Sequence, residues 1–284
     1  MKDDDFILVL ILIVIIIYYI IDLSNKKLSE NFIKNPYILN KEIAVVTCNF
    51  GNYDINENNI LKLKNYHLFD WIYFSDNKIN SDGYLNITDD YFPETIKILN
   101  DDKNRMKSKF YKFQSINFDF LKKYKYIIWM DSSIIIQNNN FVNDVISLIK
   151  NNLNIDLFVF EHYKRNTIYE EYLASKDLDK YKNHNFKEQI DFYKSTGIKD
   201  DKLFESGFLI YKNNKKMFNM MNDWWKQTLK YGYQCQISLP YVISKNNVNY
   251  KLLNENNFVK GNLNGSIWIN KLFGKVKLLH NKVN

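Results

Sequence analysis

The sequence predicts an α/β domain built on a mostly parallel sheet that is flanked by helices. Short apolar runs with the β-branched and aromatic content of buried strands recur along the chain, at residues 43–47, 71–75, 124–130 and 157–160. Stretches with apolar residues at helical spacing lie between such runs, notably 105–123 and 214–231. Strands that alternate with helices favour a parallel sheet, because each helix carries the chain back to start the next strand.

Composition places the chain among globular proteins. Of its 284 residues, 46% are hydrophobic and 16% are aromatic, which is enough for one large core and excludes global disorder. The three Pro and eight Gly exclude collagen-like and low-complexity classes. No repeat and no second core is evident, so we predict one globular domain over residues 41–284.

The formal net charge of +7 has two explanations. An anionic partner, such as a nucleoside diphosphate or a membrane surface, would favour a basic domain. Abundant Lys beside abundant Ile and Asn is also what AT-rich codons produce. The chain has no nucleic-acid-binding module and no long basic run, so nucleic acid is not an expected partner. Cys48 and Cys235 match no metal or redox spacing and are expected to be free thiols.

An unbroken apolar run occupies residues 6–21. As a helix it would be roughly 24 Å long, a little short of a hydrocarbon core of about 30 Å. We therefore predict that residues 1–23 form an N-terminal transmembrane helix of the signal-anchor type. A cleaved signal peptide is the alternative, but the acidic start and the lack of a small-residue cleavage site disfavour it. Residues 24–40, which are polar and contain Pro36, are expected to form a stem.

The orientation of this anchor is ambiguous. More lysines follow the apolar run than precede it, which leans towards a domain that faces the cytosol. The sequons at Asn86 and Asn264 would instead be glycosylation sites if the domain faced the lumen.

Polar residues at the end of one predicted strand give the first chemical signal. Asp131, Ser132 and Ser133 interrupt the apolar stretch 127–136, directly after the predicted strand 124–130. Open α/β sheets bind ligands at this end of their strands, and a carboxylate there needs a cation, hydrogen-bond donors or water beside it. An Asp that caps the next turn is the simpler explanation on local grounds.

Two further features that could bind a nucleotide follow the first strands. Gly51 lies in the loop after strand 43–47, which is typical of nucleotide sites but equally of an ordinary tight turn. Arg105, Lys109 and Lys112 decorate the predicted helix 105–123. Such residues usually form a basic face that is exposed to solvent. The more specific hypothesis is that they contact a phosphate.

The second half of the chain contributes acids, a histidine and tryptophans. His162 and Arg165 follow the predicted strand 156–161, in a segment whose alternative is a surface loop that leads into a capped helix. Glu205 is expected immediately before a strand, either as a functional acid or as a turn cap. The pair Trp224-Trp225 on helix 214–231 is more often core than a platform for a sugar ring.

Taken together, these motifs resemble a family of GT-A glycosyltransferase-like domains. The family was long described as a domain of unknown function, and it includes Golgi-anchored plant proteins linked to mucilage and pectin synthesis. The matching segments occur in the family's order and cover nearly everything from residue 43 to 245. They are 43–54, Arg105 with Lys112, 129–133, 162–165, 168–171, 205–207, Trp224-Trp225 and 236–238.

The resemblance implies a GT-A-like (Rossmann-like) fold with a nucleotide-sugar donor at the carboxyl ends of the first strands. Asp131 takes the place of the Asp-x-Asp motif, whose carboxylate binds a divalent ion, Mn²⁺ or Mg²⁺, that bridges the donor diphosphate. The third position is Ser133, so the site has one carboxylate fewer, and His280 is the late candidate for a further ligand. The residues that the resemblance assigns to the donor are Thr47, Gly51, Tyr53, Asp54, Asp76, Arg105, Lys112 and Asp131.

An acceptor side is implied as well, made of His162, Arg165, Trp225 and Gln236. Glu205 and Asp131 would be the catalytic residues. Glu205 would act as a general base on an acceptor hydroxyl or support an oxocarbenium-like centre. The family has an Asp-Gln pair before Ser where this chain has Cys235-Gln236, so that Asp cannot assist catalysis here.

We therefore expect a membrane-anchored glycosyltransferase that moves a hexosyl or pentosyl group from a nucleotide sugar to a glycan or protein acceptor. The resemblance favours a domain in the Golgi lumen over a cytosolic one. Two other functions stay open. Ser133 and Cys235 suggest a degenerate transferase that binds nucleotide or glycan without turnover, and the basic surface suggests a membrane-tethered scaffold.

Overall fold

The computed structural model describes residues 41–51, 59–78, 83–94, 96, 103–162, 164–253, 267–270 and 274–277. From Glu42 onward these residues belong to one compact unit. The predicted anchor and stem lie outside the described residues, as do Tyr53, Asp54, Asn264 and His280. Among the helices that are described, none combines the length and the apolar character needed to cross a membrane.

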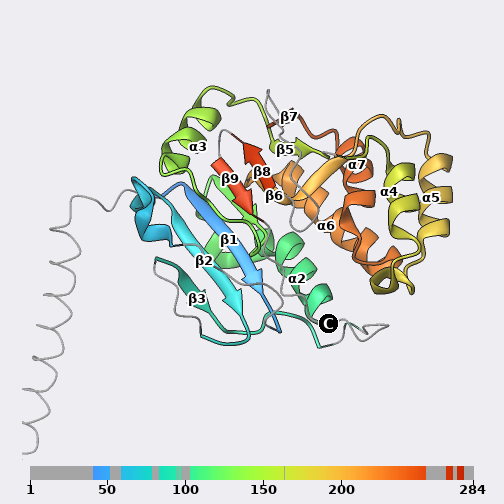
Figure 1. The fold of residues 1–284 in the computed structure, drawn as a ribbon, viewed down its shortest axis with the longest axis horizontal. Coiled ribbons are helices and arrows are strands. Elements are labelled where there is room, and N and C mark those ends of the chain that lie inside the picture. The colour runs from blue at the N-terminus through green and yellow to red at the C-terminus, as the bar shows by residue number, and fades with distance from the viewer. Residues whose placement is uncertain are drawn as a thin grey trace, which may run out of the picture. The chain divides into compact units, whose positions relative to one another are not determined.

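A seven-stranded sheet lies at the centre of this unit (Figure 1). Its order is β3-β2-β1-β4-β6-β5-β7, and all strands run parallel except β6, which is antiparallel to both neighbours. The predicted mostly parallel sheet is thus confirmed. The strands are β1 (Ile43–Asn49), β2 (Asp70–Ser75), β3 (Leu85–Ile87), β4 (Tyr126–Met130), β5 (Leu157–Glu161), β6 (Phe204–Lys212) and β7 (Tyr250–Leu252). A separate antiparallel pair consists of β8 (Ile267–Asn270) and β9 (Gly274–Lys277).

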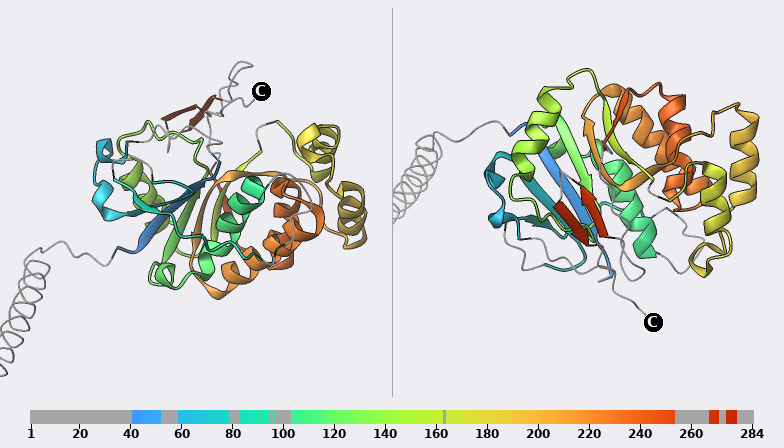
Figure 2. Two further views of the ribbon diagram at one scale, coloured as in Figure 1. Left: turned by 90° about the horizontal axis from the view of Figure 1, so that it is seen from below. Right: turned by 45° about the horizontal axis from the view of Figure 1, so that its top comes forward.

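Helices cover both faces of the sheet. On one face, α2 (Lys103–Gln114), α6 (Lys215–Tyr231) and α7 (Cys235–Lys245) pack against strand residues such as Val46. On the other face, α3 (Phe141–Lys150) packs against Val45 and its neighbours. Successive strand residues point to opposite faces, so burial on both faces explains the continuous apolar runs in the sequence. Figure 2 shows α2 in green beside α6 and α7 in orange in both views.

The helix predicted over 105–123 ends earlier, at Gln114. Two short 3-10 turns follow it, Ser115–Asn117 and Asp119–Leu121. Between them Phe118 adopts an extended backbone, with φ −73° and ψ 128°, which no α-helix can contain. The chain then enters β4. The two turns thus form a short connection between α2 and the strand that ends just before Asp131.

Two helices that follow β5 share a hydrophobic core of their own. α4 (Ile168–Ser175) and α5 (Phe186–Ser195) enclose a third hydrophobic cluster that includes Ile237 of α7. The apolar positions of α5 are spaced one helical turn apart, and the many charged residues between them hide that spacing in the sequence. Thr167 and Glu170 form a capping box at the start of α4, where the sequence indicated a cap.

An irregularity in β6 decides where several site residues lie. Val159 of β5 pairs with Leu209, but the next residue, Phe160, pairs with Glu205, so residues 206–208 form a bulge in β6. The sequence predicted Glu205 before the strand, and this was wrong, because β6 already begins at Phe204. Bulges redirect side chains and are common beside active sites.

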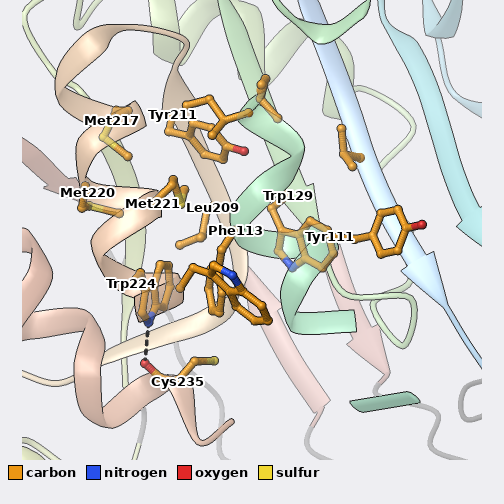
Figure 3. Packing of buried hydrophobic residues seen from close by; sticks show 14 of the residues in the cluster. Tyr111, Phe113, Trp129, Leu209, Tyr211, Met217, Met220, Met221, Trp224 and Cys235 are labelled. Atoms are coloured by element: carbon orange, nitrogen blue, oxygen red, sulfur yellow. Dashed lines mark hydrogen bonds between the residues drawn. The ribbon is translucent and has the colours of Figure 1, made fainter. Parts of the chain in front are cut away.

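Both tryptophans of α6 are core residues. The Trp224 ring lies 4.4 Å from the ring of Phe113, and its Nε1 donates to the carbonyl oxygen of Cys235 at 3.0 Å (Figure 3). That hydrogen bond holds the first residue of α7 against α6. Trp225 is 8% exposed, and its ring lies 5.7 Å from the ring of Phe110.

The sequon residue Asn86 lies on β3, at the edge of the sheet. Its Nδ2, the atom that carries the glycan in a glycosylated sequon, donates to Tyr73 O at 3.2 Å and to Ser75 Oγ at 2.8 Å. The folded domain therefore uses this amide to attach β3 to β2.

Candidate active site

Charged side chains converge on Asp131, which directly follows β4. Its Oδ1 accepts hydrogen bonds from Trp129 Nε1 at 2.6 Å and from Lys112 Nζ at 3.3 Å. Its backbone N–H donates to Gly207 O at 2.8 Å. A Cβ atom at position 207 would lie 3.3 Å from Asp131 Oδ2, so the glycine lets β6 approach the carboxylate closely. The Asp131 side chain nevertheless remains 36% exposed, so a ligand can contact it.

One face of α2 carries three cations towards this carboxylate. Arg105, Lys109 and Lys112 are spaced i, i+4 and i+7, which aligns them along a helix. Lys112 is buried, with its ammonium 5.6 Å from the centre of the Trp129 ring. Arg105 is half-buried, and its Nη1 donates to Tyr233 OH at 3.2 Å. The predicted donor residues Arg105 and Lys112 therefore share a face that ends at Asp131.

Lys109 connects this face to Cys235, the first residue of α7. Lys109 and Cys235 are close enough for each to shift the pKa of the other. Burial alone would lower the pKa of Lys109, but the charges of Cys235 and Asp131 raise it. Burial alone would raise the pKa of Cys235, but Lys109, Lys112 and the hydrogen bond with Ser206 Oγ at 3.2 Å lower it. Cys235 is a free thiol, as predicted, and it lies inside the site.

Glu205 supplies a buried carboxyl from the bulged segment of β6. Gln236 Nε2 donates to its Oε2 at 2.7 Å. Its Oε1 has no hydrogen-bond partner among the described residues and lies 3.5 Å from His162 Nε2. Burial, followed by the negative charge of Glu171, raises the pKa of Glu205 to about 8. Most of this carboxyl is therefore protonated at neutral pH.

Both ring nitrogens of His162 have hydrogen-bonding neighbours. Nδ1 accepts from the backbone N–H groups of Lys164 at 3.2 Å and Arg165 at 3.0 Å, and Arg165 Nη2 lies 3.2 Å from Nε2. Burial, followed by the charges of Arg165 and Lys164, lowers the pKa of His162 to about 3. Nε2 faces Glu205 Oε1 at 3.5 Å and Glu171 Oε2 at 3.8 Å. A neutral imidazole thus separates two buried carboxyl groups.

Glu171 completes this group, and sequence reasoning did not find it. It is 1% exposed; Arg165 Nε donates to its Oε2, while Ser175 Oγ and Gln234 Nε2 donate to its Oε1 at 3.1 and 2.5 Å. In the sequence it stands beside an ordinary exposed glutamate. The available signal was its position three residues after the buried Ile168, on the same face of α4.

Three predicted donor residues lie on or after β1 and β2. The N–H of Gly51 donates to Asp76 Oδ2 at 2.7 Å, which links the two loops. Gly51 has φ +65°, and a Cβ there would lie 2.1 Å from Asn104 Nδ2, so conformation and space both require glycine. Thr47 is buried within β1, and its Oγ1 has no hydrogen-bond partner in the described part of the chain.

The predicted acceptor-side residues are divided by the structure. His162, Arg165 and Gln236 surround Glu205 or its partner Glu171. Trp225 does not join them, because it packs in the aromatic core of α2 and α6. Trp225 is therefore a core residue, and the prediction that it lies on the acceptor side was wrong.

The described residues do not fit a divalent-metal site. No three His, Cys, Asp or Glu side chains in this part of the chain are grouped as metal ligands. Of the predicted ligands, Asp131 has one oxygen engaged by Trp129 and Lys112, Ser133 is buried, and His280 lies outside the described residues. Divalent ions need several oxygen or nitrogen ligands, and the described residues do not supply such a set.

Comparison with known proteins identifies the family. Residues 27–262 match the model of the TOD1/MUCI70 glycosyltransferase-like domain. The chain belongs to this family. The resemblance inferred from the order of motifs is thereby confirmed, and it extends over most of the chain. No protein with a curated description matches the sequence.

Several solved glycosyltransferases are similar in structure at low identity. Core-mannan synthase A from Aspergillus fumigatus, in an Mn/GDP form, has 11% identity and a TM-score of 0.42 over 77% of this chain and 74% of its own. Mouse xyloside xylosyltransferase 1 has 9% identity and a TM-score of 0.44 over 74% and 84% of the two chains. The mannosyltransferase Ktr4p from S. cerevisiae has 12% identity and a TM-score of 0.44 over 77% and 70%. Similarity this distant assigns no substrate to the present chain.

Proposed function

We propose that this domain transfers a sugar from a nucleotide-sugar donor to a glycan or protein acceptor. One observation carries the proposal: the bulge of β6 sets the buried carboxyl of Glu205 two residues from Gly207, which contacts Asp131. A carboxyl group with a pKa of about 8 and a cationic helix face therefore flank one strand end. A transfer in which the acceptor displaces the diphosphate directly uses both, a base for the acceptor and positive charge for the leaving group.

The α2 face would form the donor side. In the transfer, the bond between the anomeric carbon and the diphosphate oxygen breaks, and its electron pair stays on the diphosphate. Arg105, Lys109 and Lys112 offer positive charge to that oxygen. Charge-assisted hydrogen bonds of this kind are about twice as strong as neutral ones. The donor sugar would then lie between α2 and the bulge.

Glu205 would form the acceptor side. As the acceptor oxygen bonds to the anomeric carbon, its proton passes to Glu205. The hydrogen bond from Gln236 holds Oε2, which leaves Oε1 to receive the proton. Because the pKa of Glu205 is about 8, the ionised fraction and the transfer rate should rise as the pH approaches 8.

A second function, binding without turnover, has its own support. Glu205 is mostly protonated at neutral pH, and Cys235 stands where the family pattern has Asp. A domain of this kind would hold a nucleotide sugar and leave it intact. Donor binding with no release of nucleoside diphosphate at any pH up to 9 would favour this function over transfer.

The membrane anchor over residues 1–23 and a location in the Golgi lumen also belong to the proposal. The apolar run 6–21 supports the anchor, and family membership supports the location. Protein that remains with membranes in alkaline carbonate and leaves them in detergent would agree with an anchor. Protein that is soluble without detergent would contradict it.

Turnover of a panel of nucleotide sugars by the full-length chain in detergent tests the transferase directly. Release of nucleoside diphosphate is measured for wild type, for Glu205→Gln and for Glu188→Gln as a control on the exposed part of α5. We expect one donor to be turned over by wild type and by the control, and Glu205→Gln to lose about 100-fold or more. Equal turnover by Glu205→Gln would remove Glu205 from the mechanism.

A further inference from the structure

Lys112 is a buried ammonium group with few partners. Its side chain is 1% exposed, and Asp131 Oδ1 at 3.3 Å is the hydrogen-bond acceptor that the described residues offer it. A lysine ammonium carries three N–H donors, and burying donors without acceptors is unfavourable. The centre of the Trp129 ring lies 5.6 Å from the ammonium, and this cation–π contact offsets part of the cost of burial. The remaining donors indicate an anionic ligand.

Lys109 and Arg105 extend this group along α2. Lys109 lies one turn away from Lys112 and interacts electrostatically with Cys235 and Asp131, and Arg105 lies a further turn away, where its Nη1 donates to Tyr233 OH. The three cations span roughly 10 Å of helix, since each residue of an α-helix rises about 1.5 Å. A diphosphate, with adjacent negative groups, matches such a row better than a single carboxylate or phosphate does.

Asp131 is arranged to hold Lys112. Its Oδ1 already accepts hydrogen bonds from Trp129 and Lys112, and those donors compete with a metal ion for the same lone pairs. A divalent ion on this carboxylate would also lie close to the Lys112 ammonium. Like charges repel strongly where water is scarce. In an Asp-x-Asp site the carboxylate binds a metal ion, whereas here it accepts a hydrogen bond from a lysine.

We propose that Lys112 and Lys109 bind the donor diphosphate directly, and that this site binds a nucleoside diphosphate without a divalent ion. Asp131 is then a positioning residue that keeps Lys112 oriented towards the ligand. Cys235 plays the corresponding part for Lys109. This inference rests on the proposed function, because it states how the same donor site holds its ligand.

Calorimetric titration of the full-length chain in detergent with GDP, UDP and inorganic pyrophosphate tests the proposal. Each titration is made once in EDTA and once in excess Mn²⁺. We expect at least one nucleoside diphosphate to bind in EDTA, with affinities in the two buffers that agree within about threefold. Pyrophosphate should compete with it, because the lysines contact the diphosphate and not the base.

Substitutions then separate the roles of the two charged partners. Lys112→Met should weaken binding roughly 10- to 100-fold in EDTA, and Lys112→Arg should restore most of it. Lys103→Met, at an exposed position of the same helix, is the matched control and should bind like wild type. Asp131→Asn keeps an acceptor for Lys112, so it should weaken binding less than Lys112→Met and leave it insensitive to Mn²⁺. If Lys112→Met does not fold, Lys109→Met at a half-buried position gives the same test.

Two results would overturn the inference, and they are distinguishable. Binding that requires Mn²⁺ and is lost in Asp131→Asn would make Asp131 a metal ligand, with the proposed transferase function intact. The absence of binding by any probe or nucleotide sugar, in both buffers, would overturn the inference and the proposed function together.

Discussion

Glu205 Oε1 lies 3.5 Å from His162 Nε2, and this oxygen has no hydrogen-bond partner among the described residues. The imidazole cannot turn its other nitrogen towards the carboxyl, because two backbone N–H groups occupy Nδ1. Arg165 Nη2 also lies 3.2 Å from Nε2, so an imidazole and a guanidinium lie beside a carboxyl that burial keeps protonated. The positive charge of Arg165 lowers the pKa of Glu205 and so favours the carboxylate, against the effect of burial.

Stability should depend on pH through Glu205. Its pKa is raised from 4.5 to about 8 by burial, so the folded chain holds this proton more tightly than the unfolded chain. The resulting stability is fully present below pH 4.5 and is lost as the pH rises through about 8. Each pKa unit corresponds to about 1.4 kcal/mol, so the loss is on the order of a few kcal/mol.

Urea denaturation of wild type and Glu205→Gln at pH 5 and pH 9 checks this expectation. Glutamine mimics the protonated carboxyl and cannot ionise, so the variant should be the more stable protein at pH 9 and close to wild type at pH 5. Parallel changes in the free energy of unfolding of the two proteins would show that Glu205 titrates normally.

Glu171 and Arg165 should shift the pKa of Glu205 in opposite directions. Glu171 raises that pKa and Arg165 lowers it, so Glu171→Gln should lower it and Arg165→Gln should raise it. Carbon-13 NMR of labelled glutamate carboxyls over a pH series reports the titration, and Glu205→Gln identifies the resonance. Glu188→Gln should leave the resonance unmoved. Shifts in the same direction for both substitutions would indicate a general loosening of the site.

Trp225→Ala should destabilise the domain without a specific effect on ligands. The ring is packed against Phe110 and Phe113, and large-to-small changes at such positions cost about 3–5 kcal/mol. Trp225→Phe should lose less than half of that. Thermal unfolding and nucleotide titration measure the two effects separately. A variant with normal stability and weakened acceptor binding would return Trp225 to the acceptor side.

Cys235→Asp should fold and should weaken metal-free binding of nucleoside diphosphate. The new carboxylate would lie between Lys109 and Ser206 and would neutralise one cation of the α2 face. An ion pair that replaces a weaker contact is worth a few-fold to tenfold in affinity. Cys235→Ser keeps a neutral hydrogen-bonding group and serves as the control in the same titration. Tighter binding by Cys235→Asp would mean that the family's Asp supports the donor, and that its loss impairs the site.

The parts of the fold that follow from local pattern could be predicted from the sequence. The runs around Val45 and Ile128 are apolar on both faces, which identifies them as buried strands of a parallel sheet. The position of Asp131 at a strand end follows from the same pattern, as does the line of cations on α2. These features depend on periodicity over a few residues, and periodicity is what a single sequence shows.

The features that depend on pairing between distant segments could not be predicted. The bulge in β6 exists because β5 changes register opposite it, and its one local mark, Gly207 within a strand, is equally explained by a close approach of another segment. Glu171 looks like its exposed neighbour until α4 folds against Gln234 and Arg165. Lys109 becomes a site residue only because Cys235, far along the chain, begins α7 beside it. Each is a contact between elements, set by tertiary packing.

In the proposed function one site has two halves, a donor half on α2 and an acid half at Glu205. Steady-state kinetics of Glu205→Gln and Lys112→Met on the same nucleotide sugar test this most directly. We predict that Glu205→Gln lowers kcat by about 100-fold or more with little change in the donor KM. We predict that Lys112→Met raises the donor KM by roughly tenfold or more. If both substitutions changed the same parameter alone, or neither had an effect, the division of the site into these halves would be contradicted.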